Sequence, residues 1–237
     1  MLFNFFFKKN NKKKYKHVIS IGCNCENAYR FFQRYKFVES SLFTWANSVN
    51  INILFNALSN LDNILFNAPE KASVMWKCPD TNIYFHGTEP MEMNINPNNY
   101  TAEDYEPFAN ELKSRVNHLK EKFLSQLRDD KKTLIMYTYH TKDSEDVIVE
   151  NIRTLNDKIK TLGGNNCELL VILESKNKLN ENFDNDKNIY LRYVEQFAPC
   201  ENVTTKKYDK KSWDKIFNEF KPDFKLKKNK KFKFEEL

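Results

Sequence analysis

The sequence predicts an α/β fold: a mostly parallel sheet of about five strands with helices on both faces, plus a small hairpin. Short apolar, β-branched runs alternate along the chain with longer segments whose apolar residues recur every three or four positions. The chain has 237 residues, 41% of them hydrophobic and 30% charged, which is typical of one large globular domain. No stretch reaches the length of a membrane span.

The first half of the chain supplies a strand, two helices and the hairpin. The strand is a β-branched run that ends at Gly22, and the helices carry apolar residues at spacings of three and four. Alternation of Val74 with Trp76, and of Ile83 with Phe85, predicts the hairpin. The predicted elements are a strand at 17–21, helices at 26–35 and 51–66, and hairpin strands at 74–77 and 82–86.

The second half alternates helices and strands, which predicts parallel pairing. Asp104 is expected to cap the longest helix, with Pro107 tolerated in its first turn. Ser144 is expected to cap the next helix, which Gly163 and Gly164 end. The predicted elements are helices at about 104–128, 145–162 and 209–220, and strands at 133–139, 168–174 and 189–194.

Positive charge is concentrated at the two ends of the chain. Residues 1–16 carry +6 and residues 221–237 carry +4, which leaves −4 for residues 17–220 out of a total of +6. A nucleic-acid enzyme would carry a basic groove in its body, so nucleic acid is not an expected partner. We expect two basic tails around a single α/β domain at 17–220. Their mixed Phe and Lys residues suit weak peripheral contact with an anionic membrane, and solvated tails are the simpler interpretation.

Cysteine usage indicates a reducing compartment. The five cysteines are an odd number spread over a long chain, unlike a disulfide framework. The N-terminus places its apolar run before its lysines, which is not the order of a secretory signal. We therefore expect a cytoplasmic protein, peripheral to the inner membrane if the tails bind lipid.

Cys25 is the strongest candidate for chemistry, because it lies between the first predicted strand and the first predicted helix. Ligands of parallel sheets bind beyond the carboxyl ends of the strands. A helix N-terminus favours a thiolate, and its free N–H groups bind an oxyanion. Gly22, Cys23 and Asn24 would complete that oxyanion or substrate site, with Gly22 allowing close backbone approach. The alternative is a buried structural cysteine.

A cysteine nucleophile needs a base, and two histidines end predicted strands. His86 follows the hairpin and His140 follows the core strand at 133–139, so either could face Cys25. The alternative for each is a loop histidine bonded to backbone.

Metal and cofactor sites are weakly supported. Cys23, Cys25, Cys78 and His86 would supply four soft ligands, but the C-x-C spacing is tight and no C-x-x-C pair exists. No glycine-rich phosphate motif is present. We expect no metal and no cofactor, with a zinc-bearing structural module as a minor alternative.

The segment from Ser20 to Ala28, S-I-G-C-N-C-E-N-A, is followed by S-L-F-T-W at 41–45. These residues, with Phe85-His86-Gly87, resemble a bacterial family of unknown function described as papain-like cysteine peptidases. The resemblance covers the first 90 residues and implies Cys25 as nucleophile and His86 as base. His140, at the end of the core strand, is the alternative base on position alone.

Two departures from the family pattern matter. The family's Pro-Phe-Asp-Trp element has Thr44 in place of its acid, although Trp45 is kept, and Gly87 follows the histidine in place of an acid. Thr44 and Trp45 are expected to lie at the substrate site. The turn also resembles acetyltransferase-like proteins of polysaccharide biosynthesis, which have a fold similar to small serine esterases.

We therefore expect a cysteine-dependent acyl-transfer enzyme, either a hydrolase or an acyltransferase, in a capsule or surface-polysaccharide pathway. Its substrate would be a small molecule, a glycan or a peptide. The first alternative is a non-catalytic family member that binds a glycan or a protein, which the loss of the acid at Thr44 favours.

Overall fold

The computed structural model describes most of the chain between residues 13 and 223. For His86 and residues 102–105 it describes the backbone alone. The described residues are 13–22, 24–36, 38–64, 75–86, 102–180, 183, 186, 188–199, 205 and 208–223.

The centre of the fold is a four-stranded sheet in which every neighbouring pair of strands is parallel. Its strands lie in the order β2, β6, β7, β8, the order of the sequence. Their bounds are His17–Gly22, Thr133–Thr138, Cys167–Glu174 and Ile189–Val194. The predicted α/β class and parallel sheet are confirmed, and all four strands were predicted within one residue at each end.

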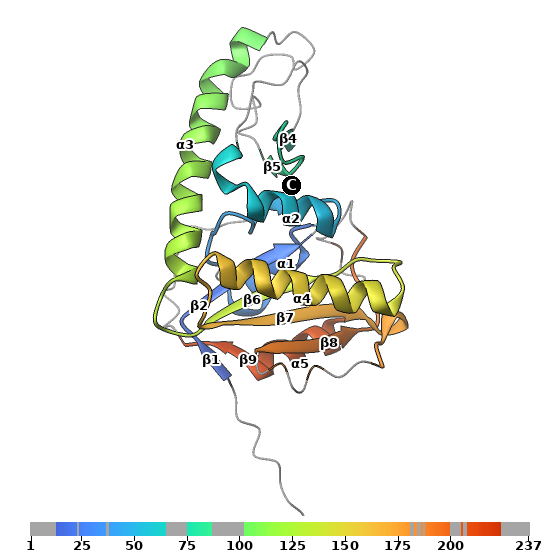
Figure 1. The fold of residues 1–237 in the computed structure, drawn as a ribbon. Coiled ribbons are helices and arrows are strands. Elements are labelled where there is room, and N and C mark those ends of the chain that lie inside the picture. The colour runs from blue at the N-terminus through green and yellow to red at the C-terminus, as the bar shows by residue number, and fades with distance from the viewer. Residues whose placement is uncertain are drawn as a thin grey trace, which may run out of the picture.

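Helices cover both faces of this sheet, as predicted (Figure 1). Side chains of β7 alternate between two hydrophobic clusters: Leu169 and Val171 join the one that includes α2, α3 and α4, whereas Leu170 and Ile172 join the one that includes α1 and α5. The helices are α1 at Glu26–Tyr35, α2 at Ile51–Ser59, α3 at Ala102–Leu127, α4 at Glu145–Thr161 and α5 at Lys210–Glu219.

A small antiparallel sheet is separate from the four-stranded sheet (Figure 1). The predicted hairpin is present as β4 (Met75–Lys77) and β5 (Tyr84–His86). A third strand, β3 (Ala46–Asn47), was not predicted and pairs with β5 on its other side.

A parallel pair of short strands joins the two ends of the described chain. Strand β1 (Lys13–Tyr15) pairs with β9 (Phe220–Pro222), and the Tyr15 side chain is fully buried. The sequence interpretation placed residues 13–15 in one basic tail and began the other at residue 221. The first boundary, after residue 16, leaves the whole of β1 in a tail, and the second divides β9 after Phe220. Three residues are too few to show a period of two.

Several predicted helix ends differ from the structure. α2 ends at Ser59 and a 3-10 turn follows at Leu61–Asn63, whereas residues 65 and 66 of the predicted helix lie outside the described residues. α3 begins at Ala102, so Asp104 lies inside the helix and is not its N-cap. Ser144 occupies the N-cap of α4 but makes no side-chain capping bond, whereas Asp209 caps α5 by accepting from the Ser212 N–H. Within the described part of the chain, no helix is long and apolar enough to cross a membrane.

Candidate functional site

The turn after β2 brings the candidate nucleophile to the carboxyl end of the parallel sheet. Gly22 ends β2 opposite Thr138 of β6, and a Cβ at Gly22 would lie 2.8 Å from Thr138 Oγ1. The close backbone approach expected at Gly22 therefore exists, and its partner is the neighbouring strand. Cys25 follows at the N-cap position of α1, with φ −85° and ψ 13°.

Two asparagines hold this turn. Asn27 Nδ2 donates to the carbonyl oxygens of Ile21 at 3.1 Å and Met136 at 3.0 Å, which ties α1 to the ends of β2 and β6. Asn24 Oδ1 accepts from the backbone N–H of Glu26 at 3.0 Å. This bond removes one of the N–H groups of residues 22–26 that were predicted to bind an oxyanion, because the Glu26 N–H already has an acceptor. Asn27 and Ala28, next in the first turn, are the residues whose N–H groups lack an intrahelical acceptor.

Glu26 is a buried carboxylate in the first turn of α1, fully excluded from solvent. Its Oε1 accepts from the Ala198 backbone N–H at 3.0 Å and from Arg30 Nε at 3.3 Å. Its Oε2 lies 3.7 Å from His140 Nε2. Burial raises the pKa of this carboxyl, and the Ala198 N–H, Arg30 and His140 oppose that rise without cancelling it.

His140 lies two residues beyond the end of β6, on the same edge of the sheet as Cys25. Its ring stacks on Phe197 with centroids 4.1 Å apart, and 19% of its side chain is exposed. The stacking and the contact with Glu26 fix the ring between a buried carboxylate and solvent. This is the position of a general base whose orientation a carboxylate holds.

Cys25 is partly exposed, whereas Cys78 and Cys167 are buried. Burial raises the pKa of the Cys25 thiol, its own backbone N–H lowers it, and the nearby Glu26 carboxylate raises it, with a net rise. The predicted effect of the helix N-terminus, a lowered pKa that favours the thiolate, is therefore wrong. The structure describes both Cys25 and His140, and no hydrogen bond joins these two side chains.

Thr44 and Trp45, which were predicted to lie at the substrate site, lie in the segment just before β3. The Thr44 hydroxyl is buried, accepts from the Ser41 N–H at 2.9 Å and donates to the Glu39 carbonyl at 3.3 Å, so it closes its own turn. Trp45 is partly buried beside β3. Ser48, which was not predicted, connects this region to the turn by donating its hydroxyl to the Gly22 carbonyl at 3.0 Å.

His86, the predicted base, ends β5 next to Met75 of β4. Its side chain and the whole of Cys23 lie outside the described residues. The register pairs Ala46 with Phe85 and Asn47 with Tyr84, so the backbone of His86 continues away from Ser48, the residue that contacts Gly22. The structure therefore brings His140, the alternative base, to the Cys25 turn.

The buried polar atoms at this edge that make no hydrogen bond with any described residue include Glu26 Oε2, Asn27 Oδ1 and Thr138 Oγ1. Buried polar groups are normally paired, so such atoms indicate a place where water or a ligand binds. Within the same described residues, no group of three or more His, Cys, Asp or Glu side chains is placed to hold a metal ion.

Sequence reasoning missed Glu26, which stands next to Cys25 in the chain. Its partners give no local signal, because His140 and Ala198 approach Glu26 from distant segments and only Arg30 lies on the same helix, one turn on. An acidic residue in the first turn of a helix usually interacts with the helix dipole at the surface, and nothing in the sequence distinguishes it from a buried one.

Comparison with known proteins leaves the site to be interpreted from its geometry. No family model, no curated protein and no solved structure matches the chain.

Proposed function

We propose that the protein is a cysteine-dependent acyl-transfer enzyme in which Cys25 is the nucleophile, His140 the base and Glu26 the group that orients the base. The observation that carries this proposal is the contact between the buried Glu26 and His140, with the partly exposed Cys25 next to Glu26 in the chain. A nucleophile, a base and an orienting third group are the components of triad chemistry.

The proposed reaction begins when the Cys25 sulfur attacks a substrate carbonyl carbon. A C–S bond forms, and His140 takes the thiol proton and returns it to the leaving group as the bond from the carbonyl carbon to that group breaks. Water or an acceptor hydroxyl then attacks the thioester and regenerates the thiol. Glu26 stabilises the transient imidazolium charge, and the N–H groups of Asn27 and Ala28 are the proposed donors to the oxyanion.

The raised pKa of Cys25 determines how this chemistry would start. The resting thiol is protonated at neutral pH, so attack requires His140 to remove its proton. Catalytic hydrogen bonds are often long before substrate binds, which accommodates the missing bond between these two residues.

Acylation by p-nitrophenyl acetate tests the proposal. Mass spectrometry of the full chain after a short exposure is expected to find an acetyl group on Cys25 before Cys78 or Cys167. The His140→Gln variant is expected to acylate about 10²-fold more slowly or worse, as loss of a general base requires. His118→Gln, at an exposed position of α3, is the matched control and should behave as the wild type.

Two results would overturn the proposal. One is acylation of Cys25 no faster than that of the buried cysteines. The other is an acylation rate that His140→Gln leaves unchanged.

A second candidate is a non-catalytic protein that binds a glycan or peptide at the same turn. The raised pKa of Cys25 favours this alternative, as does the use of Thr44 within its own loop. A Cys25→Ala variant distinguishes the two, because it would abolish acyl transfer and leave binding intact.

We also propose a cytoplasmic location, since the described cysteines are free, and a role in surface-polysaccharide synthesis, which rests on the resemblance of the Cys25 turn. The basic Phe-rich segments at the ends of the sequence would add weak, reversible membrane contact. Sedimentation with anionic vesicles at low and high salt measures that contact, and a chain that stays in the supernatant at low salt contradicts it.

A further inference from the structure

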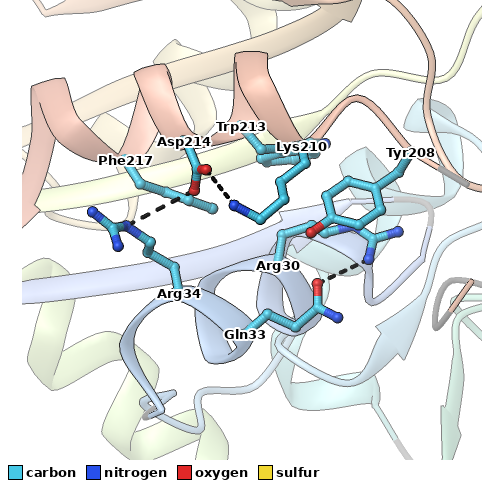
Figure 2. Close-up of a pocket in the computed structure, with 8 residues that line it drawn as sticks. All are labelled: Arg30, Gln33, Arg34, Tyr208, Lys210, Trp213, Asp214 and Phe217. Carbon is cyan, nitrogen blue, oxygen red and sulfur yellow. Dashed lines mark hydrogen bonds and ion pairs between the residues drawn. The ribbon is translucent and has the colours of Figure 1, made fainter. Parts of the chain in front are cut away.

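A pocket separate from the Cys25 turn lies between α1 and α5. It encloses about 130 Å³, and Figure 2 shows side chains reaching it from α1 on one side and from α5 with its preceding segment on the other. That volume exceeds the space one water needs by several-fold, so a phosphate or carboxylate group fits. The lining residues are Arg30, Gln33, Arg34, Tyr208, Lys210, Trp213, Asp214 and Phe217.

The pocket contains more cations than its one acid can neutralise. Asp214 is shared between Lys210 Nζ at 2.6 Å and Arg34 Nε at 3.9 Å. Arg30, the third cation, pairs with Glu26 through Nε, one turn earlier on α1. Excess positive charge in a partly enclosed space attracts an anion more strongly than the same charges would in open solvent.

Buried donors without acceptors provide the second observation. Arg30 is 2% exposed, its Nε and Nη1 donate to Glu26 and Gln33, and its Nη2 makes no hydrogen bond within the described residues. The indole Nε1 of Trp213, 1% exposed, likewise has no acceptor there. Tyr208 lies over the Arg30 guanidinium, 3.5 Å from its carbon to the ring centroid, and keeps it in place.

We propose that this pocket binds a small oxyanionic group, carried by a phosphate or by a carboxylate. The unpartnered guanidinium N–H is the buried anchor, Lys210 and Arg34 supply charge at the mouth, and Gln33 is a neutral polar neighbour (Figure 2). A ligand with anionic oxygens would satisfy donors that are otherwise buried at a cost.

Calorimetric titration of the full chain at constant ionic strength tests this site. The probes are inorganic phosphate, acetate and, as the reference anion, chloride. We expect saturable binding of one phosphate or acetate per chain, and whichever binds more tightly identifies the group. The obvious variant, Arg30→Ala, would remove a core side chain and its pairing with Glu26, so the test uses residues at the mouth.

Lys210→Gln and Arg34→Gln are each expected to weaken binding about three- to tenfold. Each substitution removes one charge-assisted hydrogen bond from a side chain that solvent partly screens, since the two side chains are 71% and 43% exposed. Lys211→Gln changes the neighbouring exposed lysine, which does not line the pocket, and should leave affinity unchanged. The proposal is overturned if neither anion binds saturably, or if Lys210→Gln and Arg34→Gln bind as the wild type does. Neither outcome depends on acylation of Cys25, so the two proposals fail separately.

Discussion

Two buried glutamates at opposite ends of the same sheet differ in how completely they are paired. Glu168, near the start of β7, accepts from the Tyr15 hydroxyl at 2.5 Å and Lys132 Nζ at 3.1 Å, and lies 3.5 Å from Lys13 Nζ. Burial raises the pKa of Glu168, but the Tyr15 hydroxyl and the two lysines outweigh it, and the net shift is downward. Glu26 has one arginine, one N–H and one histidine, and its pKa is raised.

The comparison shows which carboxylate serves the fold and which is available for function. Glu168 joins β1, β6 and β7, because Tyr15 belongs to β1 and Lys132 immediately precedes β6. Burial disfavours the ionised form of Glu26, which lies next to a histidine and a cysteine. Carboxylates with perturbed pKa values and incomplete pairing are concentrated at functional sites.

The largest effect expected from this comparison is the loss of stability in Glu168→Ala. The variant leaves a buried tyrosine hydroxyl and two lysines without their acceptor, which is expected to lower the free energy of unfolding by about 2 to 3 kcal/mol. Urea unfolding measures it. Glu150→Ala, at an exposed position of α4, is the control and should stay within about 0.5 kcal/mol of the wild type. A loss below about 1 kcal/mol would show that the Glu168 cluster is too solvated to hold β1 in place.

Tyr15→Phe tests the same cluster from the other partner. The ring, fully buried and stacked on Phe220, is kept while the hydroxyl is removed, so we expect a loss of about 1 to 2 kcal/mol. A double-mutant cycle with Glu168→Gln measures the coupling between them. Additive losses would contradict a direct hydrogen bond between the two side chains.

The two glutamates should also give pH dependences of opposite sign. Glu168 has a folded-state pKa below its usual 4.5, so its stabilisation is present above that value and is lost as the pH falls through the folded pKa. Glu26 has a folded-state pKa above 4.5, so the folded state holds its proton more tightly and stability falls as the pH rises above 4.5 towards the folded pKa.

Urea unfolding of the wild type, Glu168→Gln and Glu26→Gln from about pH 3 to pH 8 measures how the free energy of unfolding changes with pH in each. Relative to the wild type, Glu168→Gln should lose the decline on the acid side, whereas Glu26→Gln should lose the decline above 4.5. Equal slopes in the wild type and the Glu26→Gln variant would mean that Glu26 titrates as an ordinary carboxylate, which would weaken its proposed role beside His140.

The sequence predicted the sheet well because three of its four strands are buried on both faces. β6 and β7 are continuous apolar runs bounded by helices with clear three- and four-residue spacing, and both were found within one residue. β3, with two residues, and β1 and β9, with three each, are too short to carry a period. Their pairing depends on tertiary contacts, such as Tyr15 with Glu168, that local pattern does not encode.

The candidate site was predicted in part, for a similar reason. Cys25 and Gly22 were found because a strand that ends at a glycine and precedes a helix fixes their position locally. Glu26 was missed, and His140 was ranked below His86, because the contact between Glu26 and His140 spans more than a hundred residues of sequence. The predicted roles of Cys23 and the His86 side chain fall outside the described residues and stay predictions.

The smallest effect on stability that we expect comes from backbone conformation, which differs between the two ends of the sheet. At the amino end, the chain turns from α4 to β7 through Gly163, whose φ of 102° suits glycine. At the carboxyl end, a φ of 56° falls on Val49, a β-branched residue that rarely adopts the left-handed region. Val49 immediately follows Ser48, and its N–H donates to Asn47 Oδ1 at 2.8 Å, which holds the strained turn in place.

Val49→Asn should therefore stabilise the protein by about 0.5 to 1 kcal/mol, because asparagine tolerates the left-handed region. The valine is 58% exposed, so the substitution removes little apolar burial. Val147→Asn is the matched control: that valine is 41% exposed on α4, where φ is helical and the two residues have similar propensities, so its change should be near zero. If Val49→Asn stabilises the fold and also slows acylation of Cys25, the strained turn is needed to set the Ser48 bond to Gly22. Destabilisation by Val49→Asn would show that the valine side chain has packing that outweighs its strain, and the contrast with Gly163 would not hold.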